Sequence, residues 1–374
     1  PQLSEIEVGP WERKGGKGAV VHIDYRHLPN DCHVVEINPG GKSGSAQLDA
    51  LGPYLTGRSP YDIKHFTQFA FDDYAARRGS VELFCDISGI EQALWDIKAK
   101  ALDVPVYELL GGMNRNYLEC YTTTFRGGGN TLRDRAAACM EAGWRLFRFD
   151  AASLPPGQNS YDARERIRQM AADCRDARAG VRPGGKFMVD FHQRFTFIDA
   201  LRGCRLIEEF EPYLVEDPVQ TDSFLQDIPK LRSLTSVPLA AGEEWGARWD
   251  FNKLVENHDL DFVRCSLPNT GGITEKNRIC ALCETHDVGI VPHFTGPIAT
   301  AAQIHALGPY PMTVVFEYNY ATRPIPYLNE FVTFKEGKLY ANDRPGLGVT
   351  VNMDQLKLVT TISEPGPNRP TYYR

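Results

Sequence analysis

Three acidic residues each end a short hydrophobic run, and the runs follow one another at nearly equal spacing. The acids are Asp190, Glu216 and Glu243, which lie 26 and 27 residues apart. That period accommodates one strand, one helix and two loops. Carboxylate oxygens are the hard ligands that Mg²⁺ prefers. If the three strands are neighbours, the spacing predicts a site for one Mg²⁺ with coordination positions left for water or substrate.

Further short apolar runs continue this period on both sides of the three acids. Residues 144–150, 261–266, 288–293 and 313–317 each end in a polar residue, and helix-like segments separate them. Alternating strand and helix patterns predict a parallel α/β architecture. Polar residues at so many strand ends favour a closed barrel over an open sheet, which would keep its chemistry at one crevice near a glycine-rich turn. The sequence contains no G-x-G-x-x-G.

The length of 374 residues exceeds the roughly 250 that a barrel alone typically needs. We therefore predict a second, smaller domain. Residues 1–115 read as an α+β domain, with strands near 20–25 and 32–37 and helices over 60–76 and 87–98. We assign 116–335 to the barrel and 336–374 to a C-terminal segment of short strands.

The composition restricts the partners and the compartment. The net charge is −7, so we expect no nucleic-acid partner, and no apolar run has the length of a membrane span. Nine scattered cysteines suggest reduced thiols and a cytoplasmic protein. Cys280 and Cys283 form a C-x-x-C within a helical pattern, which we interpret as two small helix residues and not as a zinc or redox pair.

Several longer motifs resemble the mandelate racemase branch of the enolase superfamily. They are Ser88–Lys100, Val104–Gly112, Gly271–Thr274 and Pro345–Gly348. The resemblance implies an α+β N-terminal capping domain over a modified (β/α)₇β TIM-type barrel, with the C-terminal segment returning to the cap. It also implies that the three acids hold Mg²⁺, and we expect a homo-oligomer, from dimer to octamer.

Within this branch, two groups of acid-sugar dehydratases match best. Asp190-Phe-His192 is similar to the Asp-x-His of galactonate and mannonate dehydratases, whose histidine protonates the departing hydroxide. The segment around His293 resembles the galactonate group, whereas residues 263–266 and 315–318 resemble the mannonate group. The resemblance implies a sugar-acid substrate and a 2-keto-3-deoxy sugar acid as product.

One departure from the family leaves the catalytic base open. Most of the branch has an aspartate where this chain has Ser266, so His293 lacks the carboxylate that would raise its basicity. Mannonate dehydratases use an arginine–tyrosine pair instead, for which Arg148 and Tyr161 are candidates. The second barrel strand ends in Arg148-Phe-Asp150 and not in the Lys-x-Lys of racemases.

The remaining expectations concern substrate contacts and rival functions. We expect Glu317, Arg264, Ser266 and Asp150 to contact substrate, although Arg264 could instead fill a barrel layer with a buried partner. Cap loops at 11–17 and 73–84 would select the sugar acid. One rival is a racemase or cycloisomerase that acts on a sugar acid or lactone through the same enolate. The other, motivated by Ser266, is a non-catalytic sugar-acid-binding regulator.

Overall fold

The computed structural model of the chain describes residues 8–13, 19–24, 32–37, 51, 54–55, 58–73, 81–123, 125, 127–151, 160–220, 224–321, 325–352, 354 and 356–358. None of the helices in these ranges combines the length and the apolar character that a membrane span requires.

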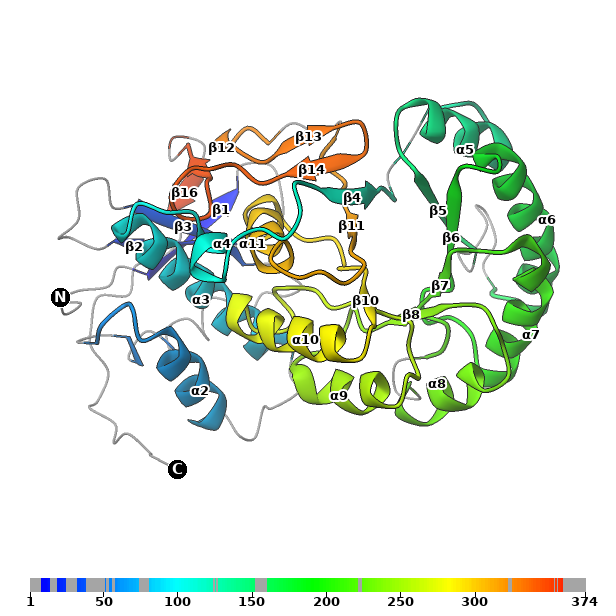
Figure 1. Ribbon diagram of the computed structural model, residues 1–374, viewed down its shortest axis with the longest axis horizontal. Coiled ribbons are helices and arrows are strands. Elements are labelled where there is room, and N and C mark those ends of the chain that lie inside the picture. The colour runs from blue at the N-terminus through cyan, green and yellow to red at the C-terminus, as the bar shows by residue number, and fades with distance from the viewer. Residues whose placement is uncertain are drawn as a thin grey trace.

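A curved sheet of parallel strands lies toward one end of the molecule, in the right-hand half of Figure 1. Six strands lie side by side in chain order, and each pairs in parallel with the next. Parallel neighbours need a crossover connection, and helices on the outer side of the curve supply it. The strands are β5 (Leu146–Asp150), β6 (Lys186–Asp190), β7 (Leu214–Glu216), β8 (Leu239–Ala241), β9 (Phe262–Val263) and β10 (Gly289–Ile290). The helices between them are α6 (Ala163–Val181), α7 (Phe197–Ile207), α8 (Phe224–Arg232), α9 (Arg248–Glu256) and α10 (Ile273–Thr285).

Two more parallel strands extend this arrangement. Strand β11 (Val315–Glu317) pairs with β4 (Leu118–Tyr121), and a bridge between Ile290 and Val314 joins β10 to the segment that leads into β11. Helices α5 (Leu132–Glu141) and α11 (Pro297–Leu307) complete the alternation of strand and helix. The predicted α/β protein with a parallel sheet is thus confirmed. Within the described residues, no ladder joins β4 to β5.

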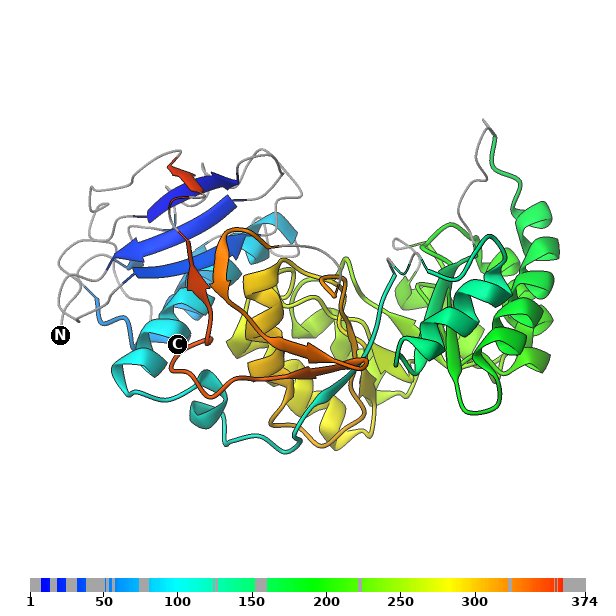
Figure 2. The same cartoon turned by 90° about the horizontal axis from the view of Figure 1, so that it is seen from above.

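An antiparallel sheet at the other end of the molecule combines strands from both ends of the chain (Figure 2). Its order is β16-β1-β2-β3, formed by Leu356–Leu358, Val8–Arg13, Ala19–Asp24 and Cys32–Ile37. Helices α2 (Ile63–Asp73), α3 (Val81–Ala101) and α4 (Val106–Leu109) follow, and α3 packs against both β3 and α10. The C-terminal chain also forms the hairpin β13–β14 (Thr333–Lys335 and Lys338–Tyr340) beside β4, and pairs β12 (Leu328–Glu330) with β15 (Thr350–Val351).

The two segments expected to be cap loops differ from that expectation where the structure describes them. Residues 11–13 belong to strand β1, and residues 81–84 begin helix α3. Residues 14–18 and 74–80 lie outside the described ranges. The C-x-x-C pair lies on a helix as expected: Cys280 and Cys283 belong to α10, and both are buried free thiols.

Strand alternation explains why the polar residues converge inside the sheet. In β6, Phe187 and Val189 belong to the core between sheet and helices, whereas Met188 belongs to a second cluster on the inner face. Because successive side chains of a strand point to opposite faces, Asp190 shares the inner face with Met188. Other polar residues likewise follow an inner-face apolar residue by two positions: Arg148 after Leu146, Glu216 after Leu214, His293 after Val291 and Glu317 after Val315.

Candidate active site

The ends of β6 and β7 place two carboxylates side by side under one guanidinium. Asp190 and Glu216 are paired in register, and both side chains are fully buried. Arg148 donates from Nη2 to Glu216 Oε1 at 3.0 Å, and the same Nη2 contacts Asp190 Oδ2. Burial and the neighbouring Glu216 raise the pKa of Asp190 well above its ordinary value, although Arg148 opposes this shift. Arg148 is therefore occupied by carboxylates in this structure.

A second guanidinium, that of Arg264, lies at the centre of the buried acids. It is 1% exposed and contacts Glu216 Oε1 through Nε at 2.7 Å. Its Nη2 lies 3.2 Å from Glu243 Oε2 and 2.8 Å from Glu317 Oε2. Its Nη1 donates to the hydroxyl of Tyr121 at 2.7 Å, a residue that the sequence analysis did not single out. We expected Arg264 to contact substrate, but the structure favours the other interpretation, a barrel-filling cation with buried partners.

Arg264 also controls the ionisation of the acids around it. Burial would raise the pKa of Glu317, but Arg264 and His293 outweigh it and lower the value to about 2. The pKa of Glu243 is also lowered, because Arg264 and His293 outweigh the effect of its burial. The backbone N–H of Phe294 donates to Glu317 Oε2 at 3.0 Å. Both carboxylates are thus held as anions in fixed positions.

The potential metal ligands fall into two adjoining groups. The open group consists of Asp150, Asp190 and His192, and the closed group of Glu216, Asp217 and Glu243. Within each group, the candidate ligand atoms lie within 4.8 Å of one another. The predicted ligands Asp190, Glu216 and Glu243 are therefore divided between the groups, with Asp190 and Glu216 adjacent across the boundary.

The charges of the two groups suit a divalent cation. Five carboxylates are buried here, namely Asp190, Glu216, Asp217, Glu243 and Glu317, against the two guanidiniums of Arg148 and Arg264. Buried charges are costly unless they are compensated. Carboxylate oxygens are also the ligands that Mg²⁺ binds best. The donor set present therefore fits the predicted metal in both charge and chemistry.

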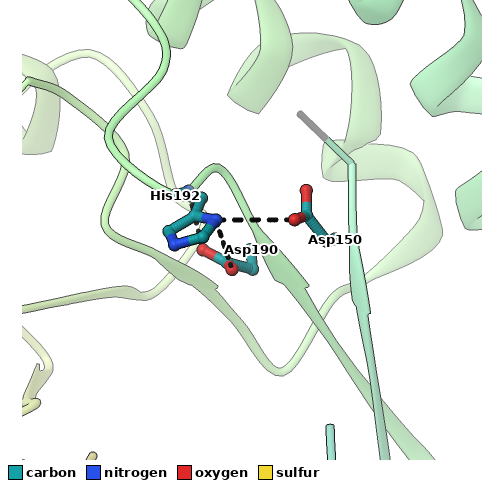
Figure 3. A group of neighbouring side chains, drawn as sticks. All are labelled: Asp150, Asp190 and His192. Carbon is teal, nitrogen blue, oxygen red and sulfur yellow. Dashed lines mark hydrogen bonds and ion pairs between the residues drawn. The ribbon is translucent and has the colours of Figure 1, made fainter. Parts of the chain in front are cut away.

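His192 lies beside the carboxylates of the open group (Figure 3). Its Nδ1 is 3.5 Å from Asp150 Oδ2 and 4.0 Å from Asp190 Oδ2, and its backbone N–H donates to Asp190 Oδ1 at 2.6 Å. The hydrogen bond to Asp150 raises the pKa of His192 to about 9, with Asp190 adding to the effect and partial burial opposing it. Asp150, expected to contact substrate, is thus the partner of His192 in this structure.

His293 faces the closed group from the segment after β10. Its Nε2 lies 3.5 Å from Glu243 Oε2, whereas its buried Nδ1 has no hydrogen-bond partner. The Oγ of Ser266 is also buried without a partner. The structure therefore gives no contact through which Ser266 or Arg264 would orient His293. The backbone carbonyl of His293 accepts a bond from Gln303 Nε2 at 3.3 Å.

The contacts of Tyr161 and Arg148, the alternative base pair, are with other residues. Tyr161 is 38% exposed, and its ring contacts that of Phe195 with centroids 6.4 Å apart. Burial raises the pKa of Tyr161 to about 12, although Arg166 and Arg194 lower it. Arg148 contacts Asp190 and Glu216 instead. A base should lose its proton readily near the working pH, so this arrangement favours His293.

Sequence reasoning missed Asp217, which completes the closed group. Alternation predicts that the residue after Glu216 points to the outer face of the sheet. Asp217 instead has a left-handed backbone, with φ of 44°, and its carboxylate lies beside those of Glu216 and Glu243. The available signal was the run Glu216-Asp217-Pro218, since a strand that ends in two acids before proline can turn its second acid inward.

Two family models match the chain. The model described as enolase C-terminal domain-like matches residues 131–355. The model of the mandelate racemase / muconate lactonizing enzyme N-terminal domain matches residues 36–111. The two matches together cover most of the chain, and they agree with the sequence resemblance.

Among curated proteins, D-galactonate dehydratases are similar over most of their length. The enzyme of Xanthomonas oryzae pv. oryzae is 33% identical over 325 residues, which is 84% of this chain and 84% of that protein. The enzyme of Pectobacterium atrosepticum is 31% identical over 342 residues, with 87% of this chain and 86% of that protein covered.

Solved structures share the fold at lower identity. An enolase from Pantoea ananatis, with bound D-gluconate and Mg, superposes with a TM-score of 0.84 at 24% identity, covering 94% of this chain and 93% of that one. A member of the enolase superfamily from Salmonella Typhimurium gives 0.86 at 22% identity, covering 96% and 100%. These similarities show the common fold of an N-terminal cap and a C-terminal barrel. The chain belongs to the mandelate racemase / muconate lactonizing enzyme family of the enolase superfamily.

Proposed function

We propose that this protein is a Mg²⁺-dependent dehydratase of a sugar acid, of the galactonate or mannonate type. It removes the proton next to the substrate carboxylate and eliminates the β-hydroxyl group, which yields a 2-keto-3-deoxy sugar acid. The predicted enzyme class, hydro-lyase, is confirmed by the D-galactonate dehydratases that match 84% of the chain. The observation that carries the proposal is the placement of two histidines beside the buried carboxylates: His192 pairs with Asp150 next to Asp190, and His293 lies next to Glu243.

Asp190, Glu216 and Glu243 are the proposed ligands of Mg²⁺. Their burial and the excess of carboxylates over guanidiniums support this assignment. In the established chemistry of the enolase superfamily, the bound cation stabilises the negative charge that develops on the substrate carboxylate when the α-proton leaves. Arg148 and Arg264 both contact Glu216 Oε1 and so help to hold this carboxylate in place.

His192 is the proposed general acid. With a pKa raised to about 9 by Asp150, its imidazolium retains a proton at neutral pH. Its side chain is 48% exposed, so the ring can reach a substrate. The leaving hydroxide would accept this proton and depart as water. The Asp150 contact keeps the ring beside the carboxylates while the proton moves.

His293 is the proposed general base. Its Nε2 is adjacent to Glu243, and the side chain is about one-third exposed at 32%. His293 follows β10 and His192 follows β6, and three strands of the sheet separate β10 from β6, so the two histidines would approach the substrate from different sides. Glu317, held by Arg264, would contact the substrate between them. The Arg148–Tyr161 pair remains the alternative base, and Ser266, Arg264 and Asp150 remain candidate substrate contacts.

The finer features of the fold are proposals of the same kind. The strand and helix order from β4 to β11 supports a modified (β/α)₇β barrel closed between β4 and β5. The pairing of β16 with β1 supports a C-terminal segment at 336–374 that returns to a cap formed by residues 1–115, with the barrel at 116–335. We also expect a homo-oligomer, from dimer to octamer.

A panel of mono- and di-acid sugars with Mg²⁺ tests the function. We expect at least one acid to give a 2-keto-3-deoxy product, EDTA to abolish turnover, and added Mg²⁺ to restore it. A product with the mass of the substrate would instead indicate a racemase or cycloisomerase. Binding without exchange of the α-proton in D₂O would indicate a non-catalytic sugar-acid-binding protein.

The same assay identifies the base. His293→Asn should stop exchange of the α-proton, whereas Tyr161→Phe should leave it near the wild-type rate. If the tyrosine variant loses exchange and the histidine variant keeps it, the Arg148–Tyr161 pair is the base and our assignment of His293 is wrong.

A further inference from the structure

Asp217 is a buried acid, and only one of its two carboxylate oxygens accepts a hydrogen bond from the protein. The residue is 3% exposed and directly follows the proposed metal ligand Glu216. Its Oδ1 accepts the backbone N–H of Gly242 at 3.2 Å. Its Oδ2 is buried and accepts no hydrogen bond. A buried carboxylate oxygen without a partner is costly, so an additional partner is expected at this position.

The nearby cation does not supply that partner. Arg264 Nε lies 3.9 Å from Asp217 Oδ2, which is too long for a hydrogen bond, and the same Nε contacts Glu216 Oε1 at 2.7 Å. The remaining nitrogens of Arg264 serve Glu243, Glu317 and Tyr121. Asp217 Oδ2 therefore receives only a weak, shared electrostatic contact.

The backbone of Asp217 is held without help from this oxygen. Its N–H donates to Ala240 at 2.8 Å, and its carbonyl accepts the N–H of Gln193 at 3.0 Å. These bonds and the Oδ1 contact fix the turn that ends β7. A purely structural role would be fulfilled by the Oδ1 atom alone, and an asparagine would provide it equally well.

The neighbours of Oδ2 indicate what the additional partner is. Candidate ligand atoms of Glu216, Asp217 and Glu243 lie within 4.8 Å of one another, and all three residues are at most 6% exposed. Asp190 belongs to the other group. Three buried carboxylates at such separations repel one another, and Arg264 closely contacts only Glu216 and Glu243, so a further cation would offset the charge of Asp217.

We propose that Asp217 is a further carboxylate ligand of the divalent cation in the closed group, acting with Glu216 and Glu243. The inference rests on the Mg²⁺ site of the proposed function but not on the identity of the substrate. Together with the proposed ligands Asp190, Glu216 and Glu243, Asp217 provides a fourth carboxylate, and ligand charge is a main determinant of affinity for hard divalent ions.

Asp217→Asn tests this role because it retains the oxygen that accepts the Gly242 N–H while it removes the charge. We expect calorimetric titration of the substrate-free protein with Mn²⁺ and Mg²⁺ to show at least roughly tenfold weaker binding than wild type, as is typical when a supporting carboxylate of a metal site is lost. Asp217→Glu, which keeps the carboxylate, should bind more tightly than the asparagine variant.

Two controls separate the metal role from a folding role. Asp227→Asn removes a surface acid of α8 that pairs with Lys230 at 3.5 Å, and its metal affinity should equal that of wild type. The melting temperature of metal-free Asp217→Asn should match that of the metal-free wild type, and Mg²⁺ should raise it less. Metal affinity of Asp217→Asn within twofold of wild type overturns the proposal.

The outcome is separable from the test of the proposed function. Metal binding that is strong in wild type and weak in Asp217→Asn supports the ligand assignment even if no sugar acid in the panel reacts. Failure of the wild-type protein to bind Mg²⁺ or Mn²⁺ overturns both the Mg²⁺ site and the role of Asp217.

Discussion

The open and closed groups of the site differ in access and in how their charges are compensated. In the open group, the side chains of His192 and Asp150 are 48% and 25% exposed, and a histidine pairs with an acid. In the closed group, Glu216, Asp217 and Glu243 are at most 6% exposed, and the guanidinium of Arg264 contacts Glu216 and Glu243 closely. Electrostatic interactions are stronger in the buried environment. The open group is therefore suited to moving a proton, and the closed group to holding charge in place.

The largest effect should follow from removing the guanidinium of Arg264, which contacts the acids of the closed group. Arg264→Met leaves Glu216, Glu243 and Glu317 buried without their common partner. Breaking a buried ion pair on one side typically costs about 3–5 kcal/mol. We expect a decrease of that order in the free energy of unfolding, measured by urea denaturation of the metal-free protein, together with loss of turnover.

A matched control is available on the surface. Arg232 contacts Asp261 at 2.9 Å, but both side chains are roughly one-third exposed. Arg232→Met should cost no more than about 1 kcal/mol, because solvent screens such pairs. If the two variants lose similar amounts of unfolding free energy, the ion pairs of Arg264 stabilise the protein no more than an ordinary surface pair does.

The second largest effect concerns the proton donor of the open group. His192→Asn should decrease kcat by about 10²-fold or more, because a general acid contributes roughly that factor. Mg²⁺ affinity should be retained, since the variant leaves Asp190, Glu216 and Glu243 unchanged. Steady-state kinetics and metal titration of the same preparation provide the measurement. If His192→Asn turns over at nearly the wild-type rate, His192 is not the general acid, and the open group has no role in proton transfer.

The sequence predicted those features of the two groups that depend on local patterns, and not those that depend on contacts between separate strands. Asp190, Glu216 and Glu317 were predictable because each ends an apolar run, and they end β6, β7 and β11. The Asp150–His192 contact links β5 to the turn after β6, and the left-handed backbone of His192, with φ of 49°, sets it. Periodicity does not encode such a turn.

The fold shows the same limit. Most barrel strands were predicted within a few residues, because period-two patterns are local. Strand β16 was not, since Leu356–Leu358 finds its partner β1 more than three hundred residues away in the sequence. The buried contacts of Arg264 were likewise undecided between substrate and core, because its acidic partners come from β7, from the turn after β8 and from β11.

A smaller effect should appear when the partner of His192 is neutralised. Asp150→Asn removes the main cause of the raised pKa of His192, so that value should fall from about 9 toward the ordinary 6.5. Wild-type His192 keeps its proton until the pH rises through about 9, whereas the variant should lose it at a lower pH. Titration of the metal-free protein by ¹⁵N NMR of the imidazole measures this difference. An unchanged midpoint would show that Asp190, and not Asp150, dominates the charge state of the open group.

The smallest effect is expected at Ser266, the position where the family has an aspartate. The Oγ of Ser266 is buried and has no hydrogen-bond partner, and the Nδ1 of His293 has none either. If the two side chains do not interact, Ser266→Ala removes nothing that the protein uses and even relieves an unpartnered hydroxyl. We expect kcat/KM for the reactive sugar acid to stay within about twofold of wild type and the free energy of unfolding within about 0.5 kcal/mol. A tenfold or larger loss of kcat/KM with unchanged stability would show that Ser266 orients His293 through a bridging water. The proposed base would then depend on the hydroxyl of Ser266.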